Sequence, residues 1–110
     1  MWQEIERTYL PWYHYGELSA QSSGRLWQMK QHIYNLPFYY IDYTLALTGA
    51  LQLWRKSQAN HELALSDYVQ LCGRGGTLPF SGLLESAGLL SPFSEGCFKS
   101  VIADARSYLL

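Results

Sequence analysis

The chain has 110 residues, of which 48% are apolar and only 15% are charged, with eight Lys and Arg against nine Asp and Glu. This length favours one domain, and the apolar fraction is too high for intrinsic disorder. A formal net charge of −1 lacks the clustered basic charge that nucleic acids and anionic membrane surfaces select. The longest apolar-rich stretch, residues 37–54, is interrupted by Asp42 and other polar residues, so no membrane span is predicted.

Cysteine and aromatic content give two further expectations. Cys72 and Cys97 do not form a CxxC pair or a disulfide framework, and the acidic start differs from a secretory signal, so a cytoplasmic location is expected. Aromatic residues make up 15% of the chain, including nine Tyr and four Trp. A free-standing domain this small is expected to carry more charge. The composition is therefore typical of the interior of a larger protein or of one half of an oligomer.

The first 37 residues predict one short helix followed by an aromatic loop. The apolar residues of 1–10 fall near one helix face, and Pro11 ends that helix. Residues 11–24 contain Pro, two Gly and several Ser, which is typical of a loop. Residues 25–31 fit either a helical turn or an extended piece, and residues 35–37 (NLP) form a stop before the next element.

Residues 38–110 predict a helical bundle without strand-like alternation. The first helix is apolar on most of its circumference, as a buried helix is, and Asn60 is expected to cap the second. With the short helix near the N-terminus, the sequence predicts one all-α segment, 1–110, of about four to five helices. The bundle helices are expected over residues 38–56, from Asn60 to the glycines at 73, 75 and 76, over 79–88, and over 94–109.

The sequence does not predict a metal site on this chain. The usual zinc pattern, HExxH, places two imidazoles four residues apart on one helix face so that both reach one metal. Residues 61–65 (HELAL) come nearest, but Leu65 stands at the second ligand position, so a capped helix start explains them better. Cys72 and Cys97 lie in or near apolar helix positions and are expected to fill space rather than to act as nucleophiles.

The segment 32–43 (HIYNLPFYYIDY) carries the remaining candidate chemistry. On a helix that starts near Pro37, Tyr39 and Tyr43 are four residues apart and share one face. Tyrosine hydroxyls and a histidine can donate hydrogen bonds to the charge that develops on a tetrahedral intermediate. The alternative, that these rings are packed core and each hydroxyl has a bonding partner, stays open.

The same segment, continued to Ala46, resembles the C-terminal end of oligoendopeptidase F-type zinc metallopeptidases, which are relatives of thimet oligopeptidase. The resemblance spans nearly all of this chain but only a minor part of a typical family member. Other strings that fit the family are Gly24 with 26–28 (LWQ), 50–54 (ALQLW), 68–72 (YVQLC), 75–76 (GG), 79–80 (PF), 88–89 (GL) and 91–93 (SPF).

The resemblance implies an all-helical peptidase whose deep channel admits short peptides. It implies a zinc ion held by an HExxH helix and a later Glu, both upstream of the segment matched here. By position, His32 matches the family's loop histidine, and Tyr39 and Tyr43 match its tyrosine pair, so these three are the catalytic candidates. Tyr40 is the substrate-binding candidate. Because the zinc ligands of the family are missing here, the chain is expected to be hydrolytically silent by itself.

Two functions therefore stay open. The first is the C-terminal segment of a zinc endopeptidase acting on oligopeptides, which supplies side chains that bind substrate and stabilise the transition state. The second is a stand-alone helical interaction module, in which the helix over 38–56 pairs with a copy of itself or with a partner and the tyrosines are packing. In both cases we expect a homo-oligomer, since exposed apolar helix faces drive association.

Overall fold

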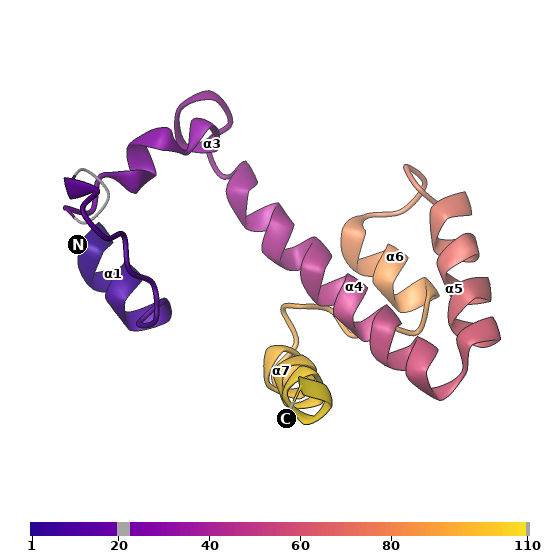
Figure 1. Ribbon diagram of the computed structural model, residues 1–110. Helices are drawn as coiled ribbons and strands as arrows, with labels where there is room; N and C mark the ends of the chain where they lie inside the picture. The colour runs from indigo at the N-terminus through magenta and orange to yellow at the C-terminus, as the bar shows by residue number, and fades with distance from the viewer. Residues whose placement is uncertain (20–22, 110) are drawn as a thin grey trace. The chain divides into compact units, whose positions relative to one another are not determined.

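The computed structural model of the chain describes residues 1–19 and 23–109 (Figure 1). In this part of the chain there are six α-helices, five of them seven residues or longer, and no strand, so the all-α prediction is confirmed. None of the described helices is both long and apolar enough to cross a membrane. The chain divides into two compact units, Met1–Ile41 and Asp42–Leu110.

The first unit contains short helical elements connected by turns. The predicted helix at the start is confirmed as α1 (Trp2–Tyr9), and the segment that the sequence left ambiguous is helical. Three of the residues in the predicted loop over 11–24, residues 20–22, lie outside the described part of the chain. The remaining elements of this unit are η1 (Leu26–Met29), α3 (Gln31–Asn35) and η2 (Tyr39–Ile41), where η denotes a 3₁₀ turn.

One position of the first unit requires glycine, because its backbone lies very close to α1. Gly24 has φ +76°, and a Cβ atom there would lie 2.8 Å from Cβ of Gln3. Any other residue would strain the backbone and collide with α1. On the same helix, Glu6 accepts a hydrogen bond from the Tyr15 hydroxyl, which ties the aromatic segment after α1 back to it.

The second unit is a bundle of helices, in which α4 and α5 form a helical hairpin (Figure 1). The Asn60 cap is confirmed, because its side-chain oxygen accepts a hydrogen bond from the Leu63 amide at 3.1 Å. Gly88, with φ +65°, follows the short helix as predicted. The four helices are α4 (Asp42–Ala59), α5 (His61–Gly73), α6 (Phe80–Ser86) and α7 (Cys97–Leu109).

Two predicted helix starts are wrong. The α4 helix begins at Asp42 rather than at residue 38, because Phe38 has the left-handed φ of +68° and residues 39–41 form a 3₁₀ turn. The last helix begins at Cys97 rather than at residue 94, since Gly96 has φ +82°. A residue with positive φ interrupts the helical backbone, so each helix starts beyond it.

A small apolar core and the polar contacts of three α4 side chains, Lys56, Gln52 and Arg55, hold the second unit together. Leu84, Ala87 and Leu89 are buried, with Leu53 of α4 and Leu71 of α5 packed against them. The ammonium of Lys56 forms an ion pair with Asp67 and donates a hydrogen bond to the Ala87 carbonyl at 2.9 Å. It therefore connects α4 with α5 and with the end of α6.

Gln52 and Arg55 connect α4 to the C-terminal part of the chain. The Gln52 side-chain amide bonds both backbone groups of Leu90, accepting from its N–H at 2.8 Å and donating to its carbonyl at 3.0 Å. Arg55 pairs with Asp104 of α7 at 2.7 Å. Further along the same two helices, the rings of Trp54 and Tyr108 meet edge to face, with centroids 4.9 Å apart.

The predicted burial of α4 is wrong for the described chain. Only Thr48 and Gly49 of this helix are buried, whereas Tyr43 is 53% exposed and Leu47 58% exposed. An apolar side chain that is half exposed has not been removed from water. The apolar circumference of α4 therefore exceeds what the other helices of this unit cover.

Candidate functional site

The structure brings His32, Tyr39 and Tyr40 together within the first unit. His32 lies in α3, and both tyrosines lie in the 3₁₀ turn η2. The imidazole stacks on the Tyr40 ring at a centroid distance of 5.2 Å and an interplanar angle of 16°. It also stacks on the Tyr39 ring at 5.9 Å and 21°. Near-parallel rings at these distances restrict the rotation of the imidazole and so fix the directions of its two nitrogens.

The turn after α3 is what returns the chain onto His32. The last helical hydrogen bond runs from the Leu36 amide to the His32 carbonyl at 3.2 Å, and Pro37 prevents the helix from continuing. Phe38 then adopts its left-handed conformation, and the Tyr39 amide donates to the Leu36 carbonyl at 3.2 Å. Because Phe38 is 97% exposed, no packing explains this backbone conformation. The conformation serves to place η2 beside α3.

The stacked rings are accessible to solvent rather than packed in a core. Tyr39 and Tyr40 are each less than half exposed, at 43% and 45%, and His32 is partly exposed. A hydroxyl at such a position can meet a ligand and donate a hydrogen bond to an oxygen of that ligand. The arrangement therefore suits recognition of a carbonyl or a developing oxyanion by phenol and imidazole donors.

Tyr43 lies in the first turn of α4, in the second unit. The prediction that it shares one α-helix with Tyr39 is wrong, because Tyr39 belongs to η2 and α4 begins only at Asp42. The phenol of Tyr43 is 53% exposed, so it too is open to solvent. Its role stays a prediction from the resemblance.

A second ring stack in the first unit was missed at the level of sequence. Trp27 of η1 and Tyr34 of α3 stack with centroids 6.1 Å apart and planes 23° from parallel. This contact holds η1 against the helix that carries His32. Two aromatic residues seven apart could have indicated this stack. It was not predicted because residues 25–31 fitted either a helical turn or an extended piece.

The described residues do not fit a zinc ion. No three His, Cys, Asp or Glu side chains of residues 1–19 and 23–109 lie together in a way that could hold a metal. His61 is engaged at the start of α5, where its Nδ1 lies 2.9 Å from the Ser57 hydroxyl.

Neither cysteine has the surroundings of a nucleophile. The Cys97 side chain is fully buried beside the Gln52 amide, with 3.6 Å between the nitrogen and Sγ. Cys72 is exposed at the end of α5, and its contact with the Tyr68 hydroxyl raises the pKa of that phenol. A buried thiol such as that of Cys97 lacks access to substrate.

Comparison with solved structures gives three close matches, each covering 98% of this chain. A structure described as an oligoendopeptidase F is 44% identical with a TM-score of 0.88, and PZ peptidase A with an inhibitor is 44% identical with a TM-score of 0.89. An oligoendopeptidase F from Bacillus anthracis str. Ames is 38% identical with a TM-score of 0.66. The chain spans only 19% of the length of each. No protein-family model and no curated protein matches the chain significantly.

Proposed function

Because this chain matches about a fifth of an oligoendopeptidase F-type peptidase in sequence and fold, we propose that it is the C-terminal segment of a zinc endopeptidase acting on oligopeptides. Its role is to supply side chains that bind the peptide and stabilise the transition state. The observation that carries this proposal is the stack of His32 with Tyr39 and Tyr40 in a chain 44% identical to a peptidase.

The proposed chemistry is hydrogen-bond donation. As a peptide bond is hydrolysed, negative charge grows on the carbonyl oxygen, and donors held in place stabilise that charge more than they stabilise the ground state. We assign this role to His32, Tyr39 and Tyr43, and we assign binding of the peptide backbone to Tyr40. Ring stacking supports the assignment because it limits the reorientation of the His32 donor when charge develops.

A covalent chimera tests this function directly. The segment of a matched peptidase that corresponds to this chain is replaced by residues 1–110, and oligopeptide hydrolysis is measured. The chimera is expected to be active. His32→Ala and Tyr43→Phe are each expected to lower kcat by about 10²- to 10³-fold, because each removes a transition-state donor. Tyr40→Phe is expected to raise KM more than it lowers kcat, as loss of ground-state binding does.

Tyr108→Phe is the matched control for the tyrosine variants. The Tyr108 ring, in α7, packs on Trp54 of α4, so removal of its hydroxyl is expected to leave the packing in place and the rate unchanged. A folded, active chimera whose kcat does not change on substitution of His32, Tyr39 or Tyr43 would contradict the proposal.

The chain by itself is proposed to be hydrolytically inactive. No three His, Cys, Asp or Glu side chains of the described residues lie together so that they could hold a metal. Hydrogen-bond donors alone do not generate the nucleophile that hydrolysis needs. Peptide assays with added zinc are expected to show no turnover above a chain-free control. Hydrolysis by the purified chain, abolished by His32→Ala, would overturn this part of the proposal.

Exposed apolar side chains on the second unit support the alternative function, a helical interaction module. Leu47, Val69 and Ile102 are each more than half exposed, at 58%, 60% and 63%. We propose that the chain in isolation self-associates through such faces. Light scattering over a range of concentrations measures this directly, and a well-folded monomer at high concentration would contradict it.

We further propose a cytoplasmic location and an oligopeptide ligand. Both cysteines are free thiols, which fits a reducing, cytoplasmic compartment. The net charge of −1 does not favour nucleic acid as a partner, so the proposed ligand is an oligopeptide.

A further inference from the structure

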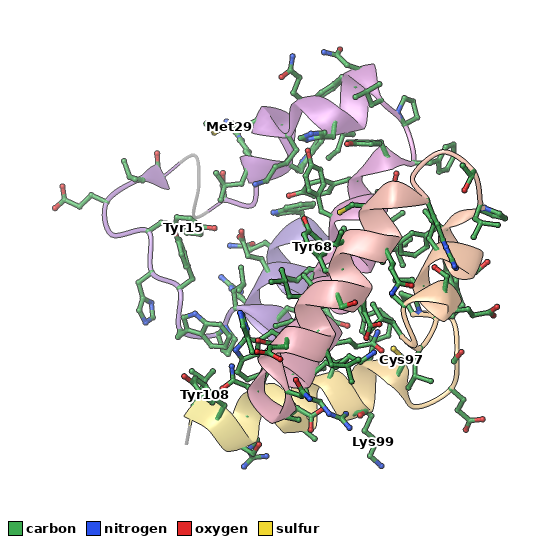
Figure 2. The ribbon with its side chains drawn as sticks, turned by 90° about the vertical axis from the view of Figure 1, so that its right-hand side faces the viewer. Tyr15, Met29, Tyr68, Cys97, Lys99 and Tyr108 are labelled. Atoms are coloured by element: carbon green, nitrogen blue, oxygen red, sulfur yellow. The ribbon has the colours of Figure 1, made fainter. Side chains whose placement is uncertain are left out.

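The second unit carries an apolar groove along α4 and α5 that no described segment fills. Its α4 wall runs through Ala46, Ala50 and Trp54, spaced four residues apart, and its α5 wall includes Leu65 and Tyr68 (Figure 2 labels Tyr68). Two hollows of about 310 and 240 Å³ make up the groove. The two hollows adjoin each other, because Ala50, Leu53 and Tyr68 line both.

The chemistry of the groove does not suit a polar small molecule. Sites for such ligands combine an apolar lining with a few converging polar groups. Here the polar side chains at one end, Ser57 and His61, are bonded to each other at 2.9 Å. The rest of the lining is alkyl or aromatic apart from the hydroxyl of Tyr68. An apolar occupant is therefore favoured.

The spacing of the lining residues favours a helix as that occupant. Side chains that recur every three or four residues along two neighbouring helices form ridges with a groove between them, and a third helix packs into such a groove. The alanines at 46 and 50 let a partner backbone approach closely. Leu65 and Tyr68, 52% and 50% exposed, provide apolar side chains that an added helix would cover.

The matched structures indicate where this helix comes from. They contain the fold of this chain over 98% of its length, yet the matched part is only 19% of each. In those chains the same helices belong to a fold of which about four-fifths lies outside the match. A helix of that remainder is therefore the best-supported occupant of the groove.

We propose that the α4/α5 groove is a docking surface for an apolar helix of the remaining four-fifths of the peptidase fold, and that this chain binds that part when it is supplied as a separate polypeptide. The identity of the partner rests on the proposed function, whereas the location of the surface rests on the groove alone. Self-association of the isolated chain competes with this docking, because it would use the same apolar side chains.

The test uses the full chain and a matched peptidase from which the corresponding fifth has been deleted. The two are co-expressed and the complex is isolated, and its dissociation constant is then measured by sedimentation velocity. A one-to-one complex is expected. Ala50→Glu and Leu65→Lys are each expected to weaken it by at least about tenfold, because each buries a charge against an apolar helix. Circular dichroism verifies that each variant keeps its helices.

Ala103→Glu is the matched control, since this exposed alanine of α7 lies outside the groove. It is expected to change the dissociation constant by no more than about twofold. Equal weakening by the control and the groove variants would overturn the inference. Absence of a complex with soluble truncated peptidase would also overturn it, as would variants that abolish self-association but leave partner binding unchanged.

Failure of docking and failure of the proposed function give different results. The combined variant His32→Ala, Tyr39→Phe and Tyr43→Phe should bind the truncated peptidase as tightly as the unmodified chain. A complex that forms but does not hydrolyse peptides would count against the function and leave the docking surface intact. An active covalent chimera without any complex between separate chains would count against docking alone.

Discussion

The two units of the chain are stabilised in different ways. Residues 42–109 have a buried core around Leu84 and polar contacts that connect separate helices. Among the described residues of the first 41, only Gly24 is buried, and the contacts are ring stacks and short-range hydrogen bonds. The unit that carries His32, Tyr39 and Tyr40 therefore has almost no core of its own, whereas the other unit has the features of a scaffold.

This difference predicts unequal local stability. Segments with few buried apolar contacts open more readily than segments with a core. The ring stack of the first unit should therefore be lost at lower denaturant concentration than the helices of the second.

Leu84→Ala is expected to have the largest effect. Leu84 is 4% exposed and its Cδ2 lies 3.3 Å from the position of a Cβ on Gly49, so the site is tightly packed. Removing three buried carbons should destabilise the second unit by about 2–5 kcal/mol. Urea unfolding followed by circular dichroism measures the loss. The urea midpoint of the helical signal should fall, whereas the midpoint at which the His32 ring resonances change should stay where it is in the unmodified chain.

If the His32 resonances and the helical signal instead change together in Leu84→Ala, the units do not unfold independently. Leu90→Ala provides the control for leucine loss on the surface, because Leu90 is 56% exposed. Its effect should be well below that of Leu84→Ala, in proportion to the smaller area buried.

Lys56→Met should destabilise the same unit by about 1–3 kcal/mol. The Lys56 side chain is 28% exposed and that of its partner Asp67 only 18%, so the substitution leaves a partly buried carboxylate and the Ala87 carbonyl without their donor. Arg55→Met is the comparison, because Arg55 is 58% exposed in its pair with Asp104. An exposed ion pair contributes about 1 kcal/mol or less. If the two variants lose the same free energy of unfolding in urea, the burial of the ion pair does not determine its contribution to stability.

The second unit was also the more predictable from sequence. The Asn60 cap, the glycine after α6 and the helical periodicity are local signals that act within a few residues, and each was confirmed. The starts of α4 and α7 were not predictable in this way. They depend on the backbone conformations of Phe38 and Gly96, and helix propensity does not indicate a left-handed phenylalanine.

The candidate site could be located from sequence but its geometry could not. The order of residues 32–43 indicated which rings to consider, and the resemblance supplied their roles. The stack of His32 on Tyr39 and Tyr40 arises from the turn at 36–38, whereas the sequence pattern alone favoured a helix that pairs Tyr39 with Tyr43. Helical periodicity does not indicate a turn of this kind, because the turn depends on the left-handed backbone conformation of Phe38. The roles of all four residues stay predictions.

Phe38→Gly is expected to stabilise the first unit. A left-handed conformation costs a residue with a side chain about 1–2 kcal/mol, and glycine avoids that cost but loses more backbone entropy on folding. The net gain should be about 0.5–1 kcal/mol. It is measured as a shift in the denaturant midpoint at which the His32 ring resonances change. Phe38→Ala keeps the unfavourable conformation, so it should give no gain, and a gain in both variants would contradict the explanation.

Tyr15 should show the smallest effect, confined to alkaline pH. Its hydrogen bond to the Glu6 carboxylate raises the pKa of the phenol from the ordinary value of 10.0 to about 12. Since the folded pKa is raised, the contact is fully stabilising below pH 10 and is lost as the pH rises towards about 12. Absorbance at 295 nm should therefore lose a component near pH 12 in Tyr15→Phe, with the rest of the titration curve unchanged. In Glu6→Gln the phenol should titrate at a lower pH, because the neutral amide neither repels the phenolate nor holds the proton as strongly.

If Tyr15→Phe instead removes absorbance near pH 10, the hydrogen bond to Glu6 does not persist in solution, and the aromatic segment after α1 is not held to that helix.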